Sequence, residues 1–128
     1  MKIVIIEDEP DTAEMYAEML RISGYEVVNF FGGSAAVQKL ADQAPDAVVL
    51  DLMMPDLSGL EVLDFIKEQP NLSSLPVVIV SAKTMPDDIE KGLKAGAVAY
   101  LTKPVSFSDL RAAIDSAISD NSAGKGLR

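Results

Sequence analysis

The 128-residue sequence contains no cysteine, no histidine and no tryptophan. Without cysteine the chain can form no disulfide, no thiolate zinc site and no cysteine nucleophile. Without histidine it lacks the commonest transition-metal ligand and the commonest general base of enzymes. Any metal ion that this chain binds should therefore be a hard cation that prefers oxygen ligands.

Positive charge is also scarce, because 11 Lys and Arg residues stand against 20 Asp and Glu residues and leave a net charge of −9 at pH 7. This balance argues against direct nucleic-acid binding, which needs clustered basic side chains against phosphates. No apolar run approaches the roughly 20 residues that span a bilayer, and the first apolar run is too short for a signal peptide. We therefore expect a cytoplasmic protein that binds neither nucleic acid nor membrane.

The sequence does contain a regular alternation of short apolar runs with amphipathic segments of helix length. Such alternation is typical of repeated βα units around a parallel sheet. The first, third and fourth runs are wholly apolar, as in strands covered on both faces, whereas the second and fifth suit the edges of a sheet. The expected strands are 3–6, 25–30, 47–50, 77–80 and 99–101, and the expected helices are 12–22, 33–44, 60–69, 86–96 and a last one from about 106.

Polar residues follow four of these apolar runs at the points where the expected strands end. Glu7 and Asp8 follow the first strand, Asp51 the third, Ser81 the fourth, and Lys103 lies just past the fifth. The carboxyl ends of parallel strands share one edge of a sheet, and open α/β sheets bind their ligands there. We therefore expect these side chains to meet in one site.

Three carboxylates gathered at that edge would repel one another unless a cation or a proton lay between them. A cluster of oxygen donors without His or Cys suits Mg²⁺, which binds through one or two carboxylates and keeps several waters. Lys103 could neutralise the cluster or bind an oxygen of an added phosphoryl group. The alternative is an ordinary acidic patch at strand ends, and the presence of Ser81 and Lys103 at the same edge argues against it.

Five segments, in this order and at this spacing, make the chain resemble the receiver domain of two-component response regulators over about residues 1–120. They are Glu7-Asp8, residues 48–55 around Asp51, Gly59, Ser81-Ala82-Lys83 and residues 99–104. The resemblance implies a flavodoxin-like α/β fold, in which five helices flank a doubly wound, five-stranded parallel sheet in the order 2-1-3-4-5. The polar residues 121–128 fall outside it, and we expect them to form a flexible tail or a linker stub.

The resemblance also implies a role for each residue at the sheet edge. Asp51 would accept a phosphoryl group from a sensor histidine kinase or a histidine phosphotransfer protein, and Ser81 and Lys103 would each bind a phosphoryl oxygen. Mg²⁺, with Mn²⁺ as a substitute, would be bound by Glu7, Asp8, Asp51 and the main-chain carbonyl of Met53. Such a domain is not a conventional enzyme, since it would only react slowly with small phosphodonors and slowly hydrolyse its own acyl phosphate.

The same resemblance makes Ser81 and Tyr100 a phosphorylation-dependent switch that would reshape the surface formed by the fourth helix, the fifth strand and the last helix. That surface would control an output protein or domain, and phosphorylation could also pair two copies of the chain. The residues expected on partner surfaces are Met15, Ile89, Tyr100 and Val105. Met15 is in helical register with Met19 and Ile22, and methionines at this spacing can belong to a core or to an adaptable binding surface.

Some positions depart from the pattern of the family. Val105 stands where many relatives have Phe. Receivers of winged-helix transcription factors carry an acidic pair before the aromatic switch residue and arginines in the last helix, which form a charged dimer interface. The corresponding residues here are Val98, Ala99, Ala113 and Asp115. These departures weaken the case for that charged interface.

Three other functions would make different demands on the sequence. A phosphatase of the haloacid dehalogenase type would need a second acid two residues after the nucleophile, where this chain has Met53. A nucleotide- or flavin-binding domain would need a Gly- or Thr-rich phosphate loop after the first strand, where residues 7–10 (Glu-Asp-Glu-Pro) would repel phosphate. A pseudo-receiver, which binds partners without being phosphorylated, remains the alternative, although the intact acceptor, acid pair and lysine argue against it.

Overall fold

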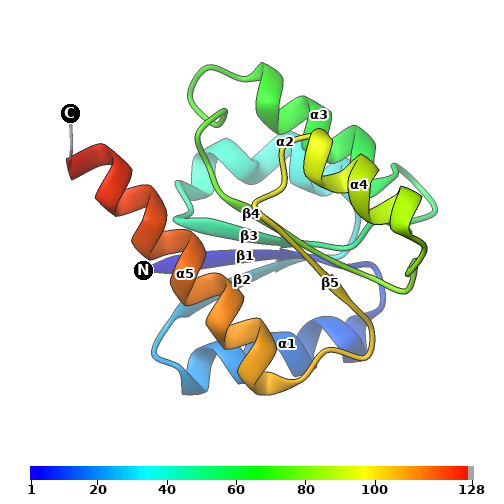
Figure 1. Cartoon of the computed structure of the whole chain (residues 1–128), viewed down its shortest axis with the longest axis horizontal. Coiled ribbons are helices and arrows are strands. Elements are labelled where there is room, and N and C mark those ends of the chain that lie inside the picture. The colour runs from blue at the N-terminus through cyan, green and yellow to red at the C-terminus, as the bar shows by residue number, and fades with distance from the viewer. Residues whose placement is uncertain (127–128) are drawn as a thin grey trace.

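Five parallel strands form one sheet in the order β2-β1-β3-β4-β5, and each strand is followed by a helix (Figure 1). The fold class and the strand order predicted from the sequence are therefore confirmed. The computed structural model describes residues 1–126, with side chains up to Asp120. In chain order the elements are β1 (Lys2–Ile6), α1 (Pro10–Ile22), β2 (Glu26–Phe30), α2 (Gly33–Gln43), β3 (Ala47–Leu50), α3 (Gly59–Glu68), β4 (Val77–Ser81), α4 (Pro86–Lys94), β5 (Ala99–Thr102) and α5 (Phe107–Gly126).

Burial follows the order of the strands in the sheet. β1, β3 and β4 lie inside the sheet, and all their residues except Lys2 are buried. β2 and β5 lie at the two edges and are only partly buried. The wholly apolar runs of the sequence are therefore the strands that helices cover on both faces, as expected.

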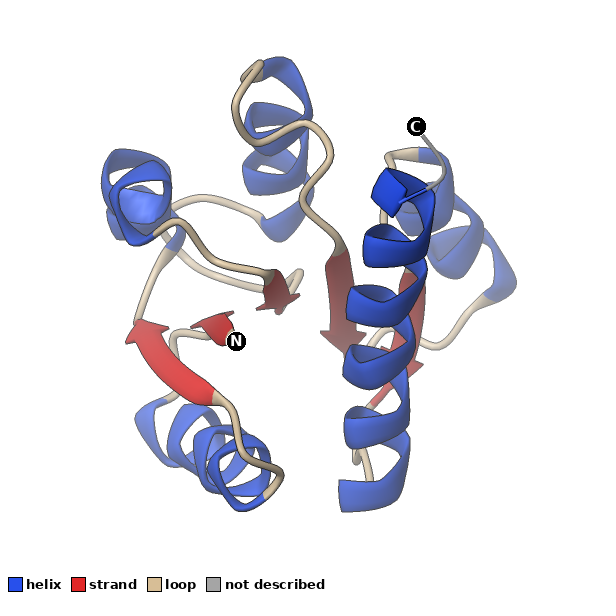
Figure 2. Ribbon diagram, turned by 90° about the vertical axis from the view of Figure 1, so that its left-hand side faces the viewer, coloured by secondary structure: helices blue, strands red, loops and turns tan. Residues whose placement is uncertain are grey.

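The two faces of the sheet belong to two separate hydrophobic clusters. Val4 and Ile6 of β1 pack in one cluster with side chains of α2 and α3, whereas Ile3 and Ile5 pack in the other with α1 and α5. Figure 1 shows α4 on the same side as α2 and α3, and the turned view in Figure 2 shows helices on both sides of the strands. Burial on both faces holds the strands in fixed register, and this register positions the residues that follow each strand.

The exposed face of α1 carries Met15 and Ile22, two of the three residues that the sequence placed in helical register. The buried face consists of small residues and two larger ones, namely Ala13, Tyr16, Ala17 and Leu20. Met15 and Ile22 are 46% and 73% exposed, and Met19 is half-buried. Two alanines on the buried face bring α1 close to the sheet.

In three helices, the residue just before the helix caps the first turn with its own side chain. Ser106 accepts a hydrogen bond from the Asp109 N–H (3.1 Å), which confirms the predicted start of α5. Ser58 accepts one from the Glu61 N–H (3.3 Å) at the start of α3. Glu9 accepts one from the main-chain N–H of residue 11 (2.8 Å), so α1 begins at residue 10 rather than at residue 12 as predicted.

α5 continues further than the sequence predicted. Residues 121–128 were expected to form a flexible tail, but the helix runs to Gly126, and residues 127–128 lie outside the described part of the chain. No proline interrupts the sequence after Pro104, so nothing forces the helix to end earlier. Figure 1 shows the last turns of α5 extending past the sheet. Although α5 has 20 residues, neither it nor any other helix within residues 1–126 is long and apolar enough to cross a membrane.

Candidate functional site

The register of the sheet places the ends of β1 and β3 at the same level. Ile6 pairs with Leu50 across the two strands, and the Asp51 N–H donates to the Ile6 carbonyl (3.0 Å). Glu7 and Asp51 therefore leave neighbouring strands side by side. Asp8 follows one residue later, and one carboxylate oxygen from each of the three acids lies within 4.8 Å of the others.

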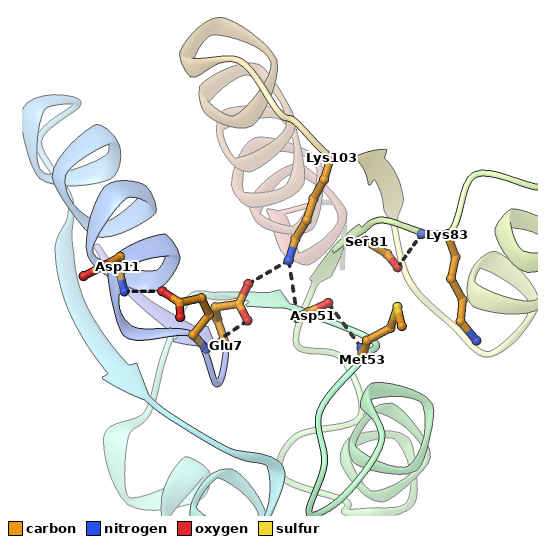
Figure 3. A network of polar contacts seen from close by, with 8 residues as sticks. Glu7, Asp11, Asp51, Met53, Ser81, Lys83 and Lys103 are labelled. Carbon is orange, nitrogen blue, oxygen red and sulfur yellow. Dashed lines mark hydrogen bonds and ion pairs between the residues drawn. The ribbon is translucent and has the colours of Figure 1, made fainter.

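Lys103 enters this acidic cluster from the end of β5 (Figure 3). Its Nζ donates to Glu7 Oε1 (2.9 Å) and to Asp51 Oδ2 (3.3 Å). Its main-chain N–H donates to the Ser81 carbonyl (2.8 Å), which anchors the residue beside the end of β4. The Glu7 and Lys103 side chains are 2% and 25% exposed, so these ion pairs are largely shielded from water.

Burial controls the protonation of the acidic cluster. It is the main reason that the pKa of Glu7 rises from 4.5 to about 7, while the hydrogen bond from Lys103 opposes this rise and the Asp51 carboxylate adds to it. Burial alone would lower the pKa of Lys103, but its bonds to Glu7 and the charge of Asp51 outweigh burial and raise it. Without a metal ion Glu7 therefore takes up a proton at a higher pH than an ordinary carboxyl group, and a bound cation would compete with that proton.

The donors in this cluster fit a hard divalent cation. Three carboxylates converge, and the single ammonium group of Lys103 leaves two negative charges uncompensated when all three acids are ionised. Oxygen donors of this kind suit Mg²⁺ better than the nitrogen- and sulfur-preferring transition metals. The acids predicted as metal ligands are thus brought together, as the sequence led us to expect.

The loop that follows Asp51 is held against it by main-chain contacts. The Met53 N–H donates to Asp51 Oδ1 (3.2 Å), and the Met53 side chain is exposed. The Gly59 N–H donates to the Leu52 carbonyl (3.0 Å) and closes the loop. A side chain at Gly59 would collide with the main-chain carbonyl of Asp51, so glycine is required at this close approach.

The site lies within a region that matches one protein family. The family model described as the response regulator receiver domain matches residues 3–115, which include every residue of the acidic cluster, Ser81 and Lys103. The chain belongs to this family.

Similar proteins share the receiver domain but differ in length. TcrX, a probable transcriptional regulatory protein of Mycobacterium tuberculosis, is 40% identical over 109 residues, which are 84% of this chain and 45% of TcrX. DivK, a polar-differentiation response regulator of Brucella anthropi, is 30% identical, and the match covers 92% of this chain and 96% of DivK. This chain therefore spans about half the length of TcrX and nearly all of DivK.

A solved structure offers a comparison for the acidic cluster. The crystal structure of the receiver domain of the sensor histidine kinase PA1611 from Pseudomonas aeruginosa has a TM-score of 0.85 and 30% sequence identity. The match covers 92% of this chain and 97% of that one. That protein has a magnesium ion coordinated in its active site cleft.

In this receiver domain Ser81 and Tyr100 contact the same residue of the loop after β4. The Lys83 N–H donates to Ser81 Oγ (3.1 Å), and the Tyr100 hydroxyl donates to the Lys83 carbonyl (2.7 Å). The Tyr100 ring also lies against α4, since a Cβ at Gly92 would be 2.9 Å from its Cδ2. A displacement of Ser81 would therefore reach Tyr100 and α4 through Lys83.

The residues predicted for partner surfaces differ in exposure. Met15 is exposed, and Ile89 and Tyr100 are half-buried. Val105 is 9% exposed and packs in the same cluster as Leu110 of α5. The prediction that Val105 lies on a partner surface is wrong for this structure, because the side chain is buried in the hydrophobic cluster that joins the sheet to α1 and α5.

Sequence reasoning missed two residues that support the site. Tyr16 is buried on α1, near enough to the cluster to sense the charges of Lys103 and Glu7, and burial raises its pKa. Its position on the buried helical face was a readable signal. Asp56 accepts hydrogen bonds from the first turn of α2, and this contact between distant segments had no local signal in the sequence.

Proposed function

We propose that the chain is a working receiver domain in which Asp51 accepts a phosphoryl group from a phosphohistidine on a sensor histidine kinase or a histidine phosphotransfer protein. A carboxylate oxygen of Asp51 would bond to phosphorus while the P–N bond breaks, and the histidine nitrogen would keep the electron pair and take up a proton. The supporting observation is the buried meeting of Glu7, Asp8 and Asp51 with Lys103 at the ends of parallel strands.

Each residue of the site has a role in this transfer. A Mg²⁺ ion, or Mn²⁺ in its place, would offset negative charge on the phosphoryl group. Lys103 would exchange a carboxylate partner for a phosphoryl oxygen, and the Ser81 hydroxyl would donate to another oxygen. The ligands of the ion would be Glu7, Asp8, Asp51 and the Met53 carbonyl. The magnesium ion in the receiver domain of PA1611 supports this assignment.

The phosphorylated state would be read at the surface of α4, β5 and α5. If Ser81 moved toward a phosphoryl oxygen, Lys83 would follow, and Tyr100 would lose or change its hydrogen bond to the Lys83 carbonyl. A separate protein, a linked output domain or a second phosphorylated copy could bind the changed surface. Turnover would be slow, since the domain would act as a phosphoryl acceptor and slow self-hydrolase rather than as a conventional enzyme.

The acceptor assignment is tested by measuring the intact mass after incubation with Mg²⁺ and acetyl phosphate. We expect one phosphoryl adduct on the wild-type chain, none after Mg²⁺ is chelated, and none on Asp51→Asn, which keeps the shape of the side chain but lacks the nucleophilic carboxylate. Asp64→Asn is the matched control, because Asp64 is exposed on α3 and away from the cluster.

Two results would contradict the proposal. An adduct on Asp51→Asn equal to that on Asp64→Asn would place the acceptor elsewhere. A wild-type chain that binds Mg²⁺ but takes no phosphoryl group, either from acetyl phosphate or from a phosphorylated histidine phosphotransfer protein, would favour a pseudo-receiver.

A further inference from the structure

The first turn of α2 is capped by a residue from a distant part of the chain. Gly32, which precedes the helix, provides no capping side chain. Instead, the Gly33 N–H donates to Asp56 Oδ1 (3.2 Å) and the Ser34 N–H donates to Asp56 Oδ2 (3.0 Å). These two backbone donors hold the pKa of Asp56 down at about 2, so it stays ionised under all ordinary conditions.

The loop that carries Asp56 also packs directly on this turn. A Cβ at Gly32 would be 2.9 Å from Asp56 Oδ2, and a Cβ at Gly33 would be 2.7 Å from Leu57 Cβ. Contacts this short leave no room for side chains at the two glycines. The β3–α3 loop (residues 52–58) and the α2 start therefore fit together as one unit.

The other end of the same loop is attached to the phosphorylation site. The Met53 N–H donates to the Asp51 carboxylate, and the Leu52 carbonyl accepts from the Gly59 N–H. Asp56 lies three residues after Met53, whose carbonyl is one of the proposed metal ligands. The loop is thus a short closed segment that follows the acceptor directly and contacts the α2 start through Asp56 and Leu57.

We propose that Asp56 couples the metal site to the first turn of α2. This inference rests on the proposed function, since it requires a cation at Asp51 and the Met53 carbonyl. A bound cation would fix the loop, and Asp56 would then hold the Gly33 and Ser34 amides more firmly. Because such coupling is reciprocal, losing the Asp56 contact must weaken cation binding. Asp56 is a positioning residue, and the α2 start becomes a second region that responds to the site.

The test combines amide hydrogen exchange with calorimetric Mg²⁺ titration of the full chain. In the wild type we expect Mg²⁺ to slow exchange at Gly33 and Ser34. In Asp56→Ala this response should vanish. Mg²⁺ should also bind about tenfold more weakly, which is the lower end of the loss in metal affinity seen when a residue that supports the ligands without touching the metal is replaced. Asp56→Asn keeps one of the two acceptor oxygens and places an amide NH2 where the other accepts, so its Mg²⁺ affinity should fall between those of the wild type and Asp56→Ala. Asp64→Ala removes the same charge from α3 and should bind Mg²⁺ like the wild type.

The outcomes separate this inference from the proposed function. If Asp56→Ala binds Mg²⁺ as tightly as Asp64→Ala, or if Mg²⁺ leaves exchange at Gly33 and Ser34 unchanged in the wild type, the coupling is refuted while the receiver function stands. A wild-type chain that binds no Mg²⁺ would refute both. If Asp56→Ala fails to fold, the wild-type exchange data and the Mg²⁺ affinity of Asp56→Asn still show whether Asp56 couples the metal site to α2.

Discussion

A carboxyl group that is 2% exposed, as in Glu7, is stable as an anion only where cations face it. Lys103 supplies one cation, and a metal ion would supply two more charges. The pKa of Glu7 is raised to about 7 in the metal-free protein, so protons and metal ions compete for the same oxygens near neutral pH. One residue therefore links folding, pH and metal binding.

This link predicts how the stability of the metal-free protein depends on pH. The pKa of Glu7 is higher in the folded chain (about 7) than in the unfolded chain (4.5), so the folded state binds more protons. The stabilisation from protonated Glu7 is complete below pH 4.5 and is lost as the pH rises through about 7. Urea unfolding across this range should show the loss in the wild type and a flatter profile in Glu7→Gln. Equal slopes for the two proteins would contradict the assignment.

Lys103 carries a second prediction at the residue scale. Lys103→Ala removes a cation but leaves all three carboxylates, so Mg²⁺ binding should remain largely in place. Phosphorylation should then no longer change the surroundings of Tyr100, because no ammonium group would hold the phosphoryl oxygen. NMR of the Tyr100 ring with and without phosphorylation measures this, with the exposed Lys39→Ala as a control. If phosphorylation changed the Tyr100 signals of Lys103→Ala as much as those of the wild type, Lys103 would not be the residue that couples the phosphoryl group to Tyr100.

At the scale of the elements, the strands were predictable and several features of the helices were not. Each interior strand is a continuous apolar run covered on both faces, and the site residues directly follow such runs, so Glu7, Asp51 and Ser81 could be placed from sequence alone. The burial of Val105 and the capping of α2 by Asp56 depend on which elements pack together. Those contacts join segments far apart in the chain and leave no periodic signal.

α4 provides a prediction of its own. Replacing Gly92 by alanine favours the helix by about 1 kcal/mol. However, the new Cβ would be 2.8 Å from Ile79 Cδ1 and 2.9 Å from Tyr100 Cδ2, so the Tyr100 ring must move. We expect Gly92→Ala to break the hydrogen bond from Tyr100 to the Lys83 carbonyl, seen as changed NMR signals of the ring. The exposed neighbour Lys91→Ala should leave them unchanged, and an undisturbed ring in Gly92→Ala would contradict the packing.

At the scale of the whole molecule, the sheet is shared by two hydrophobic clusters that lie on opposite faces. Each strand contributes alternate residues to both clusters, so neither face can come apart without exposing the other. The loops at the carboxyl edge, which carry the site, therefore project from a rigid layer.

This arrangement predicts a single cooperative unfolding transition. Ile66 of α3 and Ile114 of α5 are fully buried in different clusters. Either Ile→Ala variant should lower the free energy of unfolding by about 2–5 kcal/mol, and Ile→Val at the same site by about 0.5–1.5 kcal/mol. Urea melts should keep the same m-value in all four variants. A biphasic melt for one face would show that the clusters unfold separately.

The position of Gly92 has a consequence for the resting protein. α4 is nine residues long and has this glycine buried under the Tyr100 ring, so it combines short length with weak intrinsic helix formation. If the chain is phosphorylated as proposed, such a helix would already exchange between conformations in the unphosphorylated protein, and phosphorylation would change their populations. Under the proposed function, a fraction of unphosphorylated molecules would then bind the output partner and give a low background signal, which phosphorylation would amplify instead of creating.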